Sequence, residues 1–327
     1  MKKAATISML FACVLSVYTF LTWETEPEQM RGPASVPQNY DSLKGCEKQE
    51  VLWEKALTSI YKDLPGYRKF GAFQLLGMSF QELQKKGNHH SDFAPDGWKK
   101  YLHRRGALAK VKIVAKDSKY TGVFKGAECA LLRISLTYKA AGGKPVAPGL
   151  ALKVFRDGTF SANVSALVSL NGQEQDFNIF KNPMSNIVPV GSGLGQKLVH
   201  KLFHKVSQYP EELVAQNMAE IDAHGSKIKD VISPKQLFFV PGSTMRFSSD
   251  SHDVREDLVT IPEGTVVYQL RALSEKHKDF NYEEYSPETV DSFVKDSVHI
   301  ADIVTTSEFV TSQFGDDGIF FRHQFRP

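Results

Sequence analysis

The sequence predicts an α+β fold in which eight antiparallel strands close into a barrel with helices at its flanks. Eight short segments alternate apolar and polar residues between turn residues, and helical patterns precede and interrupt them. Eight alternating strands suit a closed barrel. The 327 residues are 42% hydrophobic and 24% charged, which is an ordinary globular composition.

The predicted strands fall into two groups of four. They are 107–115, 129–138, 150–155, 163–170, 236–240, 266–272, 299–305 and 318–325. In the first of them, Ala109, Val111 and Ile113 share one face. Lys110 and Lys112 lie on the opposite face, so the two faces of this strand differ in polarity.

Helical patterns flank and separate these strands. Apolar residues at helical spacing predict a first helix; they are Leu52, Trp53, Ala56, Leu57 and Ile60. A second helix is predicted to begin at Ser79, where Glu82 completes a capping box. Two further helices are predicted over 194–222, between the two groups of strands, with Pro210 at a first helical position.

The N-terminus predicts export. Lys2 and Lys3 precede an uncharged run over residues 4–23, and Glu24 follows it. A basic start before an apolar run is typical of a secretory signal. The run of about 20 residues is also long enough to span a bilayer as an uncleaved anchor. Both alternatives place the remaining chain outside the cytoplasm, secreted or anchored to a membrane.

These signals divide the chain into three parts. Residues 1–23 form the signal peptide or anchor, residues 24–45 a linker with several prolines, and residues 46–327 the barrel domain. Cys46 and Cys129 both fall in the barrel domain. They form one disulfide in an oxidising compartment or remain two thiols, and the sequence alone leaves both alternatives open.

Four segments of the predicted barrel resemble the haem catalases in their order and spacing. His103-Arg104-Arg105-Gly106-Ala107 resembles the His-x-x-Gly-Ala run that opens the catalase barrel. Leu132-Arg133-Ile134-Ser135 resembles the family's Val-Arg-Phe-Ser, and Gly149-Leu150-Ala151-Leu152-Lys153-Val154-Phe155 its Gly-Phe-Ala-Val-Lys-Phe strand. Asn163 falls at the family's distal asparagine. The resemblance extends over residues 100–325 as a pattern rather than as close identity.

The resemblance implies a catalase-like barrel that acts on hydrogen peroxide or an organic hydroperoxide, with haem as its cofactor. His103 would then be the catalytic base, Ser135 would fix the tautomer of its imidazole, and Asn163 would donate to the peroxide. Arg133 would meet a haem propionate. Lys100 stands where the family places an arginine, three residues before the distal histidine.

The axial ligand of such a haem is not identified by the sequence. The family's tyrosine lies in an Arg-x-Phe-x-Tyr run beyond the barrel, and this sequence contains no such run. Tyr268, His299 and His323 are the alternative donors. Asn163 also begins the sequon Asn163-Val164-Ser165, so glycosylation of an exported protein competes with its distal role.

Three functions follow as alternatives. One is an exported catalase-related oxidoreductase; the second is a haem-free barrel that binds or oxidises a small ligand; the third is a non-enzymatic secreted or matrix protein that retains the scaffold. A net charge of +3 and the lack of zinc-finger spacing argue against nucleic acid as a partner. His200 and His204 lack a metalloprotease glutamate, so no metal site is predicted. The oligomeric state stays open.

Overall fold

The computed structural model describes part of the chain, and its main feature is one antiparallel sheet. The described residues are 37–57, 92–93, 105–116, 127–136, 149–155, 157, 161–168, 184–185, 237–243, 254–274, 277, 287–313 and 319–321. The strands are β1 (Arg105–Ala115), β2 (Cys129–Leu136), β3 (Gly149–Phe155), β4 (Ala162–Val168), β5 (Met184–Ser185), β6 (Leu237–Pro241), β7 (Val266–Ala272), β8 (Val298–Thr305) and β9 (Val310–Gln313).

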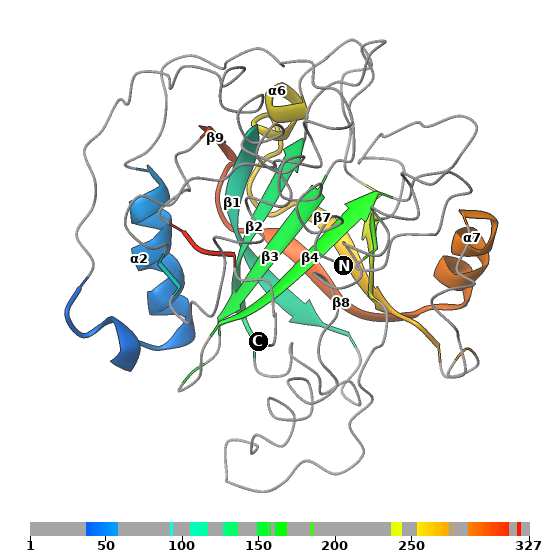
Figure 1. The fold of residues 1–327 in the computed structure, drawn as a ribbon, viewed down its shortest axis with the longest axis horizontal. Helices are drawn as coiled ribbons and strands as arrows, with labels where there is room; N and C mark the ends of the chain where they lie inside the picture. Colours follow the sequence, from blue (N-terminus) through cyan, green and yellow to red (C-terminus); the bar gives the residue numbers. More distant parts are fainter. Residues whose placement is uncertain are drawn as a thin grey trace, which may run out of the picture.

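The sheet closes on itself as a barrel. Each strand from β1 to β8 pairs antiparallel with the next, and β8 pairs with β1, which completes the ring. The strand β9 pairs with the first half of β1, next to the segment that β8 occupies. Figure 1 shows the long strands β1 to β4 side by side, with β7 and β8 behind them. A closed ring leaves few unpaired strand edges.

The inner face of the barrel is an apolar core. Because side chains alternate along a strand, every second residue of each strand points inward. From the first four strands the core cluster contains Ala107, Ala109, Val111, Ile113, Ala130, Leu132, Ile134, Leu150, Leu152, Val154, Val164 and Ala166. Leu258 of the short helix α6 (Val254–Leu258) joins the same cluster, and α6 contacts β1 and β2.

A second apolar cluster lies on the outer face, between the sheet and the N-terminal helix. The helix α2 (Gly45–Leu57) follows a short 3-10 turn, η1 (Tyr40–Ser42), and contacts β2 and β3. The buried members of this outer cluster are Tyr40, Leu52, Trp53, Ala56, Leu108, Leu131, Phe155, Ile319 and Phe321. The strands β1, β2 and β3 are therefore covered on both faces, which explains their long apolar stretches.

The structure confirms the antiparallel barrel, with two changes in its membership. Seven of the eight predicted strands correspond to β1–β4 and β6–β8. Of the predicted strand 318–325 the structure describes only residues 319–321, and there Ile319 forms an isolated bridge with Phe93 instead of a barrel strand. The ring instead contains β5, and β9 adds to its edge; both are too short for a clear periodic pattern.

Other predictions fall partly or wholly outside the described residues. The first predicted helix is α2, whereas the helix at Ser79, the helical pair over 194–222 and residues 1–36 lie outside. The helix α7 (Pro287–Asp296) precedes β8 and was not predicted. Tyr40 is buried although it falls in the predicted linker. Within the described part of the chain, no helix is long and apolar enough to cross a membrane.

Candidate functional site

The outer face of β2 and β4 carries three of the residues that the sequence singles out. Arg133 is 3% exposed, Ser135 4% and Asn163 7%. Their strand neighbours Leu132 and Ile134 belong to the inner core. Since side chains alternate along a strand, these three polar side chains point away from that core. Buried polar groups usually serve a structural or a binding purpose, because burial without a partner is costly.

Arg133 and Ser135 are brought together beside Gly106. Arg133 is opposite Leu108 in the β1–β2 register, and Ser135 is opposite Gly106. A Cβ atom added to Gly106 would lie 3.0 Å from both Cζ and Nη2 of Arg133. The guanidinium therefore occupies the space above Gly106. The charge of Arg133 therefore lies at the beginning of β1, in the row of Ser135, that is, level with the cross-strand pair of Gly106 and Ser135.

The hydroxyl of Ser135 already has an acceptor for its proton. Its Oγ donates a hydrogen bond of 3.4 Å to the carbonyl oxygen of Gly149, at the start of β3. A hydroxyl that donates its single proton keeps its lone pairs for accepting. Ser135 thereby connects β2 to the start of β3 on the buried outer face.

Asn163 shares the outer face but not the row of Ser135. Asn163 pairs with Lys153 across β3 and β4, and Lys153 pairs with Leu131, which is two residues along β2 from Arg133. The structure therefore places Asn163 on the same surface, near Lys153 rather than near Ser135. Its burial also argues against the glycosylation alternative, because a sugar on this side chain requires solvent around it.

Lys153 forms the most extensive polar cluster on this face. Its ammonium is fully buried and lies 2.8 Å from Oδ1 of Asp92, which is 12% exposed. The same ammonium donates to Oγ of Ser161 at 2.9 Å, and Ser161 donates to Asp92. Tyr40 donates its hydroxyl to the other carboxylate oxygen of Asp92 at 2.8 Å. Three segments far apart in sequence meet at this carboxylate.

The cluster changes the acidity of its members. Burial by itself would raise the pKa of Asp92, but the charge of Lys153 and three hydrogen bonds outweigh it and lower that pKa below its ordinary value. Burial, together with the negative charge of Asp92, raises the pKa of Tyr40. At neutral pH, Asp92 is therefore a carboxylate and Tyr40 a neutral phenol that donates to it.

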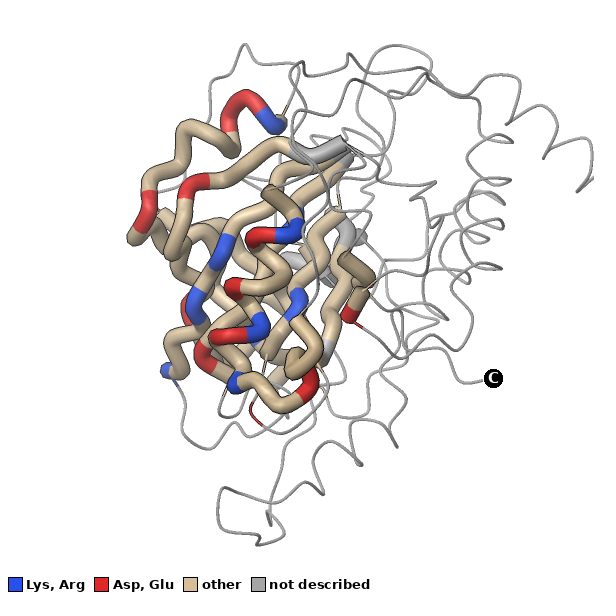
Figure 2. The backbone as a smooth tube through the Cα atoms, turned by 90° about the vertical axis from the view of Figure 1, so that its left-hand side faces the viewer, with Lys and Arg blue, Asp and Glu red and all other residues tan. Residues whose placement is uncertain are grey.

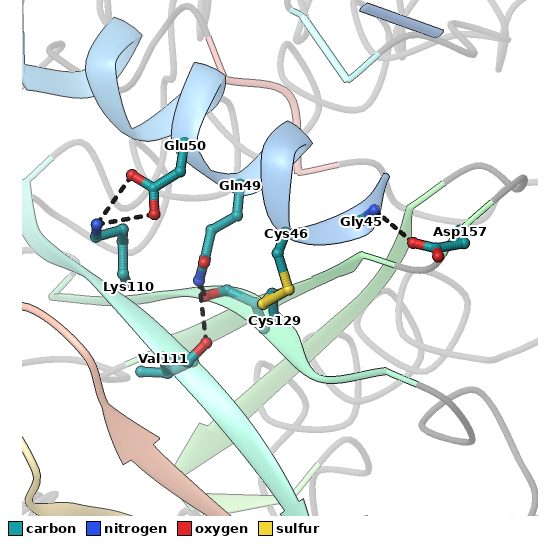
Figure 3. The surroundings of a disulfide bond; sticks show 9 residues. Gly45, Cys46, Gln49, Glu50, Lys110, Val111, Cys129 and Asp157 are labelled. Carbon is teal, nitrogen blue, oxygen red and sulfur yellow. Dashed lines mark hydrogen bonds and ion pairs between the residues drawn. A yellow bond between two sulfur atoms is a disulfide. The ribbon is translucent and has the colours of Figure 1, made fainter. Parts of the chain in front are cut away.

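A disulfide and an amide attach α2 to the strands. Cys46 and Cys129 are bonded, with their Cα atoms 5.2 Å apart, so the disulfide alternative is the one the structure contains (Figure 3). Gln49 donates its side-chain amide to the carbonyl oxygens of Val111, at 3.0 Å, and Ala130, at 2.6 Å. These bonds satisfy two buried carbonyl groups on neighbouring strands.

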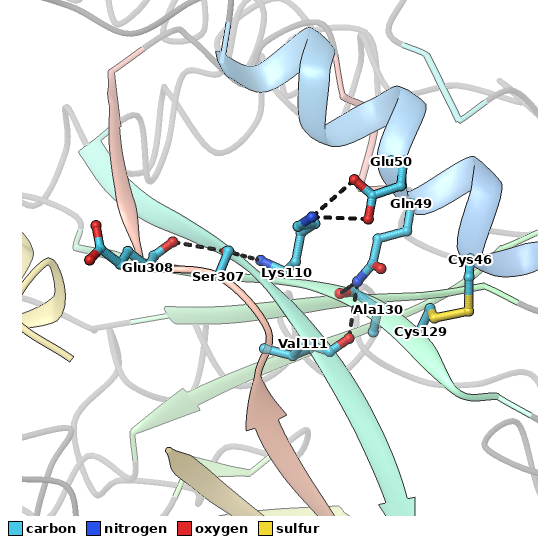
Figure 4. Close-up of polar contacts among 9 residues, drawn as sticks. All are labelled: Cys46, Gln49, Glu50, Lys110, Val111, Cys129, Ala130, Ser307 and Glu308. Atoms are coloured by element: carbon cyan, nitrogen blue, oxygen red, sulfur yellow. Dashed lines mark hydrogen bonds and ion pairs between the residues drawn. A yellow bond between two sulfur atoms is a disulfide. The ribbon is translucent and has the colours of Figure 1, made fainter. Parts of the chain in front are cut away.

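Further polar contacts of α2 lie at its two sides. Lys110 on β1 bonds both carboxylate oxygens of Glu50 at 2.9 Å, and its backbone N–H donates to Ser307 (Figure 4). The backbone N–H of Gly45 donates to Asp157 at 2.7 Å. Exposed ion pairs contribute little stability. Figure 2 shows acidic and basic residues interspersed along the described part of the backbone.

The two described candidates for an axial ligand lie away from Arg133. Tyr268 belongs to the inner core, and burial raises the pKa of its phenol, so it is protonated at neutral pH. His299, on β8, pairs its Nε2 with Asp302 at 2.8 Å, and Asp302 also pairs with Lys116. Neither side chain lies on the outer face of β1–β4.

Other predicted site residues fall outside the described part. His103, Lys100 and His323 are among them, so their predicted roles stay predictions. Among the described residues, no group of three or more histidine, cysteine or acidic side chains is placed to hold a metal ion.

The sequence prediction missed two contributions to this face. One is the cluster around Lys153, where a lysine inside an apolar strand was the available signal, because such a lysine needs a carboxylate. The other is the space that Gly106 provides for Arg133.

No family model matches the chain, and neither a curated protein nor a solved structure matches it.

Proposed function

We propose that the protein is an exported, catalase-related barrel that binds a carboxylate-bearing small molecule on the outer face of β1–β4 and acts on peroxide there. One observation carries this proposal. Arg133, Ser135 and Asn163, which the sequence order singles out, are all buried on one face of neighbouring strands. A buried guanidinium is suited to a carboxylate, which it binds through charge-assisted hydrogen bonds.

Haem is the first ligand to test, because its propionates are carboxylates. The buried guanidinium of Arg133 fits that part of the group. A bound haem would supply redox chemistry that side chains lack. The chain's own residues would bind the propionate at Arg133 and accept a hydrogen bond from an imidazole N–H at Oγ of Ser135. The peroxide would receive a hydrogen bond from the amide of Asn163.

A haem-free ligand site is the second candidate, and the axial candidates favour it. Tyr268 lies in the inner core, and His299 is paired with Asp302. The described residues therefore fit the carboxylate of a haem better than they fit its iron. A smaller carboxylic acid would use Arg133 in the same way without needing an axial ligand.

The disulfide supports export. Disulfides persist in oxidising compartments and are rare in the cytosol, and Cys46 is bonded to Cys129 across 83 residues. A reporter fused to the C-terminus of the full chain should be found outside the cytosol. A cytosolic product with an intact N-terminus and free thiols would contradict export.

Absorbance spectroscopy of the purified protein tests the haem form. If haem is the ligand, addition of hemin gives a Soret band, and the protein consumes peroxide in a reaction that His103→Ala abolishes while the band remains. A Lys112→Gln variant is the control, since Lys112 is exposed on the same face of β1. A protein that stays colourless excludes the haem form. A panel of small carboxylic acids, screened by thermal shift, would then test the second candidate.

A further inference from the structure

The guanidinium of Arg133 does not lie in the row of its own Cα atom. Arg133 is opposite Leu108 on β1 and Ala151 on β3. Its Cζ and Nη2 atoms nevertheless lie 3.0 Å from the position of a Cβ atom on Gly106, which is opposite Ser135. The Arg133 side chain therefore extends along β2 toward the position of Ser135, two residues away, and across to β1.

Glycine is needed at position 106 for space. A Cβ atom there would meet the guanidinium at 3.0 Å and the carbonyl oxygen of Ile134 at 2.7 Å. Both separations are shorter than ordinary contacts between carbon and these atoms. The carbonyl belongs to the sheet backbone, whereas the guanidinium is the far end of a flexible side chain and yields more easily. A Cβ atom at this position therefore pushes the guanidinium of Arg133 away from its place by a few tenths of an ångström or more.

We infer that Gly106 is a positioning residue that seats the guanidinium of Arg133 in the row of Ser135. A ligand carboxylate is then held at the beginning of β1, three residues after His103 in the sequence. The ligand part of this inference rests on the proposed function. The seating of the guanidinium does not, because it concerns two residues of the chain alone.

A double-mutant cycle on the full chain, with its disulfide intact, tests the seating. Gly106→Ala is compared in the Arg133 protein and in an Arg133→Ala protein by urea unfolding. Contact with the carbonyl of Ile134 affects both backgrounds and cancels. We expect Gly106→Ala to lower the urea midpoint at least twice as far when Arg133 is present. Equal shifts would overturn the inference.

Failure to fold is also informative in this cycle. If Gly106→Ala alone does not fold, recovery of the fold by adding Arg133→Ala supports the seating. Two variants that both fail to fold would overturn the inference that the guanidinium makes glycine necessary at position 106, because the carbonyl of Ile134 alone would then require it.

A second arm tests the ligand with hemin and with haem dimethyl ester, whose propionates are blocked. Gly106→Ala should weaken the binding of hemin at least tenfold and leave the binding of the ester unchanged. Equal weakening of both would remove the carboxylate from the inference. If the unchanged protein binds neither compound, the haem form of the proposed function fails, and the unfolding cycle still decides the seating.

Discussion

The inner and outer faces of β1–β4 are built from alternate residues of the same strands, yet only the outer face combines apolar with buried polar side chains. The inner face consists of alanine, valine, leucine and isoleucine side chains. Much of the outer face is buried as well, and its buried residues include Arg133, Ser135, Lys153 and Asn163. Burial is therefore not what distinguishes them. The inner face holds the barrel together, and the outer face contains the groups that are able to bind a ligand.

The two faces also differ in what they tolerate. Apolar packing has no direction, so an inner residue is replaceable by another of similar volume. The polar groups of the outer face depend on specific partners, as Lys153 does on Asp92 and Ser161. Removing one partner leaves the other buried without compensation, which costs more than removing both.

The largest effect is expected from Asp92→Ala on the outer face. The substitution leaves the fully buried ammonium of Lys153 without its carboxylate. Breaking a buried pair in this way costs about 3–5 kcal/mol, measured by urea unfolding. The matched control is Asp41→Ala, an exposed aspartate in the adjoining turn, which should change stability by less than about 0.5 kcal/mol.

The double variant Asp92→Ala, Lys153→Met separates charge from packing. It removes both charges and should recover a large part of the lost stability. A double variant less stable than Asp92→Ala alone would show that the cost of the single change is not an uncompensated lysine.

Leu152→Ala should have the next largest effect, on the inner face. Leu152 is fully buried at the centre of β3. Such truncations leave a cavity and cost about 2–5 kcal/mol. Val298→Ala is the control, because Val298 is 42% exposed on β8. Leu152→Ala should lower the thermal midpoint of unfolding and leave the affinity of the folded protein for hemin unchanged. A specific loss of affinity would place the ligand inside the barrel.

Removing the disulfide should cost somewhat less. Cys46 and Cys129 are 83 residues apart, so their bond restricts a long loop in the unfolded chain. Replacing both by serine is expected to lower the free energy of unfolding by about 2–4 kcal/mol. Hydrogen exchange should show most of the lost protection in α2. A loss of protection that begins in the barrel strands would contradict the idea that the disulfide attaches α2 to the outer face of the sheet.

The smallest effect is the pH dependence that Asp92 introduces. Because its pKa in the folded protein is below the ordinary value of 3.8, its contribution is complete above that value and is lost as the pH falls through the lowered pKa. The stability difference between the unchanged protein and Asp92→Asn should therefore be constant near neutral pH and shrink below 3.8. A stability difference that grows as the pH falls would mean that folding raises the pKa of Asp92 instead of lowering it.

The sequence predicts the barrel well, because alternation along strands such as 107–115 is a local signal. The strand β5 escapes it, since the two residues Met184 and Ser185 carry no periodicity. The segment 318–325 has a strand-like composition, but its described part bridges to Phe93 and packs in the outer apolar cluster instead of joining the sheet. Which partner a strand-like segment finds depends on tertiary contacts that one sequence does not specify.

The candidate site was predictable only as far as single residues allow. Arg133, Ser135 and Asn163 are found from their order along the chain, and their common face follows from period two together with register. The direction in which Arg133 leans and its seat on Gly106 depend on distances across strands. The cluster around Lys153 joins residues up to 121 positions apart, from Tyr40 to Ser161, and no local pattern links them.

The proposal that the outer face binds a carboxylate is tested most directly by one titration. Hemin and haem dimethyl ester are titrated into the unchanged protein, Arg133→Gln and the exposed control Lys112→Gln, with the Soret absorbance as the signal. The account predicts that Arg133→Gln weakens hemin by about tenfold or more, as expected for a charge-assisted bond of 1.5–3 kcal/mol. Binding of the ester, and all binding to Lys112→Gln, should be unchanged. Equal affinity of Arg133→Gln and the unchanged protein for hemin would contradict it.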